Sequence, residues 1–167
     1  ITDSGTLAIT GVTTLAAGAS NDIKLDDLHD FSSVGITSGK DVELNDVDAI
    51  VLDASTVSGT LAVTAAGGIT DDGTLAITGA TTLTAGAGNV TLADASSTFG
   101  TLKITGADVS VLENAAMDLG ASTITGTATF NSSGNEITDS DKLVIAGATT
   151  LNAGVGNVTL DEAESTF

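Results

Sequence analysis

Carboxylates are the most abundant chemically active side chains here, because 22 of the 167 residues are Asp or Glu. An Asp follows the third expected strand of most repeating units, at Asp26, Asp53, Asp71, Asp94, Asp139 and Asp161. Clustered oxygen ligands suit Ca²⁺, and the densest acidic group is Asp26, Asp27 and Asp30. One hypothesis is therefore a weak calcium site at these three residues. The alternative is a solvated acidic edge that keeps the protein soluble and blocks lateral strand pairing. No other cofactor is predicted.

Threonines form a second candidate surface. Outward positions of the first expected strand of each unit carry paired threonines, namely Thr6/Thr10, Thr74/Thr78, Thr101/Thr105 and Thr123/Thr125. A flat array of such pairs could match an ice lattice, although Lys103 projects from the same face and Lys142, Val144 and Ala146 interrupt the last unit. The alternative explanation is that threonine suits exposed strand positions and stacks well on itself.

Catalytic chemistry is not expected. His29 is the only histidine and the chain has no arginine, so the cationic groups that assist sugar cleavage are scarce. We expect His29, within Asp27-Leu28-His29-Asp30, to lie in a solvated loop. Paired carboxylates for glycoside hydrolysis remain an open alternative, but the acids recur with the repeat, whereas an active site normally breaks it. The prediction is that the protein is not an enzyme.

A long internal repeat determines the expected architecture. Ile1-Thr2-Asp3 returns at Ile69 and again at Ile137, and Phe31, Phe99 and Phe167 keep the same 68-residue step. The expected long repeats are 1–68, 69–136 and a partial 137–167, within one continuous segment 1–167. We interpret the chain as an excerpt of a longer repetitive chain.

A shorter period lies inside the long one. The tripeptide Ile/Val–Thr/Ser/Ala–Gly/Ser begins at seven positions, each followed by segments in which apolar and polar residues alternate, as in strands with one buried face. Its first residues are Ile9, Ile36, Val57, Ile77, Ile104, Ile124 and Ile145. Three such steps sum to 68, which predicts three coils of about 22.7 residues per long repeat, with these seven residues in one interior column.

The predicted fold is therefore all-β: a right-handed parallel β-helix, or β-solenoid, of about seven coils with three short strands each. An antiparallel sandwich and a propeller explain the two nested periods less well. Phe31, Phe99 and Phe167 end the stretch that lengthens one coil in three. We expect them to return to the interior as anchors, and the alternative is a periodic docking face.

Composition excludes several classes of partner. The formal net charge is −18, and four lysines cannot neutralise a run of nucleic-acid phosphates. No apolar stretch approaches the ~20 residues of a membrane-spanning helix, so neither nucleic-acid binding nor membrane insertion is predicted. The absence of cysteine excludes disulfides and thiolate metal sites.

The strings Gly-Thr-Leu-Ala-Ile-Thr-Gly at 5–11 and 73–79, with Gly-Asn-Val-Thr-Leu at 88–92 and 156–160, resemble repeats of filamentous-haemagglutinin-like adhesins. The resemblance covers the whole chain and implies a right-handed β-helix in a large, secreted bacterial surface protein. The function expected from it is that of a structural and adhesive stalk or filament shaft, extracellular or on the bacterial cell surface. Its expected partners are neighbouring repeats or further copies of itself, and a host or neighbouring-cell surface. The alternative function is a ligand-binding solenoid, with calcium on the acidic edge or ice on the threonine face.

Overall fold

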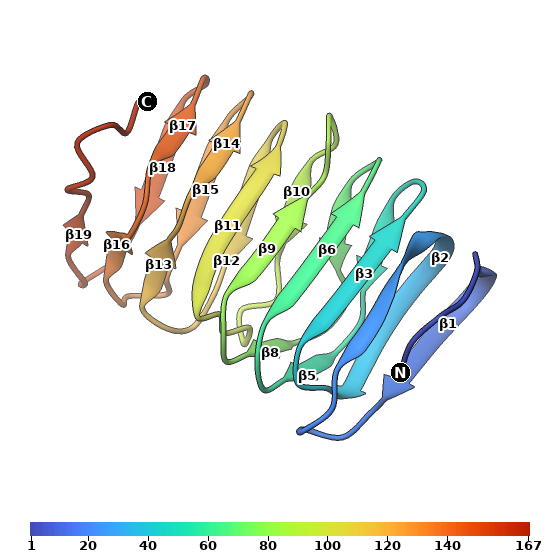
Figure 1. Ribbon diagram of the computed structural model, residues 1–167. Coiled ribbons are helices and arrows are strands. Elements are labelled where there is room, and N and C mark those ends of the chain that lie inside the picture. The colour runs from blue at the N-terminus through green and yellow to red at the C-terminus, as the bar shows by residue number, and fades with distance from the viewer.

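The computed structural model describes all residues from Ile1 to Phe167 and contains strands, bridges and turns but no helix (Figure 1). Every strand pairing is parallel, and the chain winds through about eight turns. The predicted right-handed parallel β-helix is thus confirmed, with about one turn more than the sequence suggested. No helix capable of crossing a membrane is present.

Two broad faces and one short side make up the solenoid. Face A contains the first half of β2 (Ile23–Ser38), β3 (Val42–Asp46), β6 (Leu61–Ala65), β9 (Thr81–Thr84), β11 (Thr101–Gly106), β13 (Met117–Leu119), β14 (Ser122–Ile124), β16 (Ile137–Asp139), β17 (Leu143–Ile145) and β19 (Val158–Thr159). Face B contains β1 (Ala8–Ala16), the second half of β2, β4 (Ile50–Leu52), β7 (Ile69–Asp71), β10 (Val90–Leu92), β12 (Val109–Leu112), β15 (Ala128–Asn131) and β18 (Thr149–Asn152). The short side consists of β5 (Ser55–Val57) paired with β8 (Leu75–Ile77).

The register fixes the length of a turn. On face B the column Ile50, Ile69, Val90, Val109, Ala128 and Thr149 is continuous and crosses five turns. Each turn therefore takes about 20 residues, which is also the separation of Ser33 from its hydrogen-bond partner Asp53 on the next turn. The expected coil of about 22.7 residues was too long, because one long repeat makes about three and a half turns rather than three.

One long repeat makes three full turns and about half a turn more, so residues that are equivalent in successive repeats lie on opposite faces. Ile69-Thr70-Asp71 forms β7 on face B, whereas the identical Ile137-Thr138-Asp139 forms β16 on face A. Each turn contains one sharp bend, and the position of this bend changes along the chain. Up to residue 77 the bend lies between a face B strand and the short side. After residue 116 it lies between two face A strands, β13 and β14 or β16 and β17.

The predicted single column of seven apolar residues is wrong for the same reason. Val57 stacks on Ile77, and Ile124 stacks on Ile145, as expected. Ile104, however, pairs with Leu83 on face A. Ile9 pairs with Phe31, and Ile36 pairs with Leu15. Like side chains do stack inside the solenoid, but in several columns.

A single apolar core runs along the axis. It comprises 34 buried residues from Ile23 to Ala153, supplied by inward positions of both faces and the short side. Strands such as β3 and β15 alternate buried and exposed residues, the pattern of a sheet with one buried face. Burial of like residues on successive turns is the main stabilising contribution.

Candidate functional site

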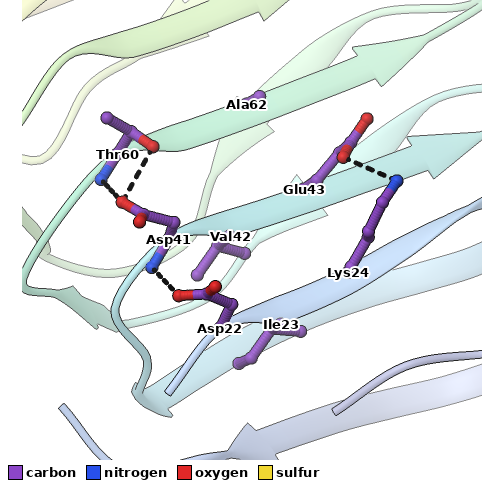
Figure 2. Close-up of a pocket in the computed structure, with 8 residues that line it drawn as sticks. All are labelled: Asp22, Ile23, Lys24, Asp41, Val42, Glu43, Thr60 and Ala62. Carbon is purple, nitrogen blue, oxygen red and sulfur yellow. Dashed lines mark hydrogen bonds and ion pairs between the residues drawn. The ribbon is translucent and has the colours of Figure 1, made fainter. Parts of the chain in front are cut away.

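The most developed polar surface lies where successive turns enter face A. A shallow depression of about 220 Å³ is lined there by Asp22, Ile23, Lys24, Asp41, Val42, Glu43, Thr60 and Ala62 (Figure 2). These residues come from three successive turns, at the starts of β2, β3 and β6. Lys24 Nζ pairs with Glu43 at 3.1 Å and also with Asp26, so the basic side chain is held flat along the face.

Side chains at this corner form a staircase of hydrogen bonds between turns. Asp41 N donates to Asp22 Oδ1 at 3.3 Å, and Thr60 donates to Asp41 Oδ1 from N (2.9 Å) and from Oγ1 (3.1 Å) (Figure 2). The hydrogen bond from Lys40, together with those from Thr60, lowers the pKa of Asp41 to about 2. Asp41 is therefore a structural anion at neutral pH.

The same staircase recurs farther along the chain, around Asp108. Asp108 N donates to Asn89 Oδ1 at 3.0 Å, and Thr127 donates to Asp108 Oδ1 from N (2.8 Å) and Oγ1 (2.9 Å). The backbone hydrogen bond from Thr127 lowers the pKa of Asp108. Both staircases need a glycine: a Cβ at Gly59 or Gly126 would lie only 2.2 or 2.3 Å from the carboxylate oxygen.

Other acids of the predicted acidic edge also bind neighbouring turns. Asp71 accepts the backbone N–H of Ala93 (2.7 Å) and of Asp94 (3.0 Å), and Asp139 accepts that of Asp161 (2.9 Å). Asp53 accepts the hydroxyl of Ser33 at 2.8 Å. These carboxylates satisfy backbone and hydroxyl donors between turns, a role that neither sequence hypothesis for the acids included.

The three residues proposed to bind calcium do not converge. Asp26 pairs with Lys24, whose hydrogen bond lowers the pKa of that carboxyl. Asp27 and Asp30 are exposed, and the Asp27 backbone N donates to Asp3 at 3.3 Å. No group of three or more His, Asp or Glu side chains is arranged to hold a metal ion. Calcium binding at this position stays a prediction.

His29 is not the solvated loop residue that we expected. It lies in β2 with its side chain fully buried, tilted against Phe31 at a ring-centroid distance of 5.1 Å. Its Nδ1 accepts the Leu7 N–H at 3.0 Å, and its Nε2 lies 2.8 Å from Asp3 Oδ2. The hydrogen bond to Nδ1 thus ties the first turn to the second. Because acidic residues flank His29 in the sequence, its inward-facing position in the strand was not recognised.

The threonine pairs expected on one face are dispersed. Thr105 and Thr123 are adjacent in register on face A, but the Thr101 hydroxyl donates to Asp118 at 2.7 Å and the Thr74 hydroxyl donates to Asp94 at 3.2 Å. An uninterrupted column of exposed hydroxyls instead lies on face B, at Thr70, Thr91, Ser110, Thr129 and Thr150.

The phenylalanines of the long repeat confirm the interior-anchor interpretation where a further turn covers them. Phe31 is 1% exposed and Phe99 is 5% exposed, and both belong to the core. Phe167, in the last turn, is 58% exposed.

Sequence reasoning missed the burial of three acids, Asp46, Glu113 and Asp139, and of a set of serines. Asp46 and Glu113 lie inside the solenoid, each at the last inward position of an alternating run. That alternation was the available signal. The serines accept main-chain N–H groups of neighbouring turns at 3.0 Å, as Ser97 does from Leu75 and Ser122 from Ile104.

Comparisons with known proteins place the chain among repeats. Neither a curated protein nor a solved structure matches it. A family model matches three consecutive stretches, residues 1–38, 39–105 and 106–167, and the Asp41 and Asp108 staircases occupy the same place near the start of the last two. The chain therefore belongs to the family described as repeats of unknown function, DUF5649.

Proposed function

We propose that this chain is a segment of the shaft of an extracellular, adhesive bacterial surface protein. The observation that carries the proposal is that strand pairing continues across the boundary between family units. Val90 of the unit 39–105 pairs with Val109 of the unit 106–167, and Thr105 likewise pairs with Thr123. Added units would lengthen one rod rather than append separate domains.

The surface chemistry supports a shaft. The acidic side chains at the corners accept hydrogen bonds from neighbouring turns, and the net negative charge of the chain keeps parallel rods apart. No enclosed pocket with converging catalytic groups accompanies this surface; the depression near Asp41 is lined by side chains that already pair with one another. The resemblance to filamentous-haemagglutinin-like adhesins supports the extracellular location and the adhesive role.

The length of engineered variants tests the shaft. One, two and three extra copies of residues 39–105 would be inserted after residue 105, and small-angle X-ray scattering would measure the maximum dimension. Each copy should add about 17 Å, from three and a half turns at about 4.8 Å each. A scrambled insert of the same length and composition is the control. Growth that is absent, or no larger than that of the scrambled insert, would refute the shaft.

The location and the adhesive role need cell-based measurements. Antibodies against the chain should label intact bacteria that produce it, and beads coated with the chain should bind host or neighbouring bacterial cells more than beads coated with an unrelated acidic protein. Labelling only after the cells are broken open would contradict the surface location. Equal binding of both kinds of bead would contradict adhesion by this segment.

A ligand-binding solenoid is the second candidate, favoured by the hydroxyl column on face B. Thr91 and its counterparts repeat at the turn spacing of about 4.8 Å without a charged side chain in the column. An ice-recrystallisation assay tests this candidate, with a variant carrying Lys at Thr91 and Thr129 as control. Absence of inhibition by the unmodified chain would remove it.

A further inference from the structure

Two family units place a carboxylic acid at the same inward position of the solenoid, and the unit 106–167 also buries Asp139, which is 8% exposed. Asp46 ends the inward positions of β3, and Glu113 follows β12 at the equivalent place of the next unit. Asp46 is 1% exposed and Glu113 is 0% exposed. An ionised carboxylate in such a place is costly unless donors compensate for lost hydration.

Asp46 has those donors. Its Oδ2 accepts the Phe31 N–H at 2.8 Å, and its Oδ1 accepts the Asp48 N–H at 3.0 Å. Burial nevertheless raises the pKa of Asp46, and the two backbone hydrogen bonds act against that rise.

Glu113 lacks them. Neither carboxyl oxygen has a hydrogen-bond partner, and the amides equivalent to those that serve Asp46, at Phe99 and Ala115, donate to no acceptor. Glutamate carries its carboxyl group one methylene farther from the backbone than aspartate does. Burial alone raises the pKa of Glu113 to about 8.

The remaining hydrogen-bond donors around Glu113 bind other acceptors, so none of them stabilises the ionised or the neutral carboxyl group. Its own N–H donates to Asn131 O on the following turn, and the next amide donates to Ser97 O on the preceding turn, each at 2.9 Å. The hydroxyl of Ser132 donates to Asn135 O at 2.5 Å rather than to the acid.

The titratable residues of the adjoining segments are engaged elsewhere or exposed. Asp94 accepts from Thr74 and Ser96, and Asp118 accepts from Thr101 and Ser140, whereas Glu136 is exposed to solvent. No basic side chain pairs with Glu113.

We propose that residues 113–116 form a pH-sensitive joint of the solenoid, which stays closed while the buried Glu113 carboxyl is neutral and loosens as that group gives up its proton to solvent. The joint lies at the turn where the bend moves from face B to face A. It would allow one segment of an otherwise uniform rod to open locally.

The direction of the effect follows from proton linkage. When the joint opens, the carboxyl becomes hydrated and regains its ordinary pKa of 4.5, whereas the closed form holds its proton up to about 8. Between these pH values the open form binds fewer protons, so opening becomes about tenfold easier per pH unit. The increase is about 800-fold between pH 4.5 and pH 8, out of a total of about 3,000-fold, and opening levels off above pH 8.

Carbon-13 NMR and hydrogen exchange of the full chain test the proposal. The Glu113 carboxyl carbon should titrate with a midpoint near pH 8, and a midpoint near 4.5 would overturn the proposal. Exchange of the Asn114 and Met117 amides would be compared with Glu113→Gln, whose side chain cannot ionise. From pH 4.5 to 7 the ratio of opening in wild type to that in the variant should rise about 150-fold, and a constant ratio would overturn the joint.

Glu113→Asp provides an independent test that keeps the acid. The shorter side chain should accept the Phe99 and Ala115 amides, as Asp46 accepts the corresponding two. The titration midpoint of the introduced aspartate should then fall well below 8, and the pH dependence of opening should shrink. A variant that titrates and opens like wild type would show that the missing donors are not the cause.

Discussion

Replacement of Phe99 by alanine tests whether each turn covers the one before it. Phe99 is 5% exposed and belongs to the core, whereas Phe167 has the same place in the next repeat and is 58% exposed because no further turn covers it. Phe99→Ala removes a buried ring and leaves a cavity, which typically costs about 3–5 kcal/mol. Phe167→Ala should change the free energy of unfolding by no more than about 0.5 kcal/mol.

Urea denaturation followed by circular dichroism measures both variants, because the chain has no Trp or Tyr for fluorescence. Phe31→Ala, at a ring 1% exposed, should resemble Phe99→Ala. The stacking would be refuted by a loss below about 1 kcal/mol for Phe99→Ala. Equal losses of unfolding free energy at Phe99 and Phe167 would also refute it, because they would mean that burial of the ring does not depend on a following turn.

Two further substitutions probe the contacts between turns. Ser97→Ala removes the acceptor of the buried Leu75 N–H and should cost about 1–3 kcal/mol in urea denaturation, whereas the exposed Ser96→Ala should stay within about 0.5 kcal/mol; equal values would contradict the role of the hydroxyl. Gly59→Ala displaces the Asp41 carboxylate, so NMR titration should show its pKa rising from about 2 toward 3.8, and an unchanged pKa would contradict the steric argument. The lowered pKa of Asp41 contributes stability that is fully present above pH 3.8 and is lost as the pH falls through about 2. The variant lacks this contribution, so its free energy of unfolding should fall less steeply in acid than that of wild type.

The fold could be predicted because its evidence is periodic. Alternation of apolar and polar residues within short segments, repeated many times, leaves few arrangements other than a stacked coil. Phe99 was placed correctly for the same reason. The number of residues per turn was not recoverable, since Ile9-Thr10-Gly11 and its counterparts mark a recurring sequence, not a recurring angle around the axis.

The candidate site was harder to predict because its contacts join residues one full turn apart. His29 and Glu113 stand among polar neighbours, and their burial depends on which strand face the register turns inward. Likewise, the sequence shows that Asp41 is acidic but not that Thr60 of the next turn donates to it. Such cross-turn bonds depend on turn length, the quantity that the repeat left undetermined.

The half-turn offset of the repeat makes the rod two-sided. A surface patch that occurs once per unit, such as the Asp41 or the Asp108 staircase, faces opposite directions in alternate units. It returns to the same side only after seven turns, about 34 Å along the axis. A lateral partner would therefore meet only the odd or only the even copies. With the patch present on both sides, a rod of this kind presents the same contacts to a partner on either side of it.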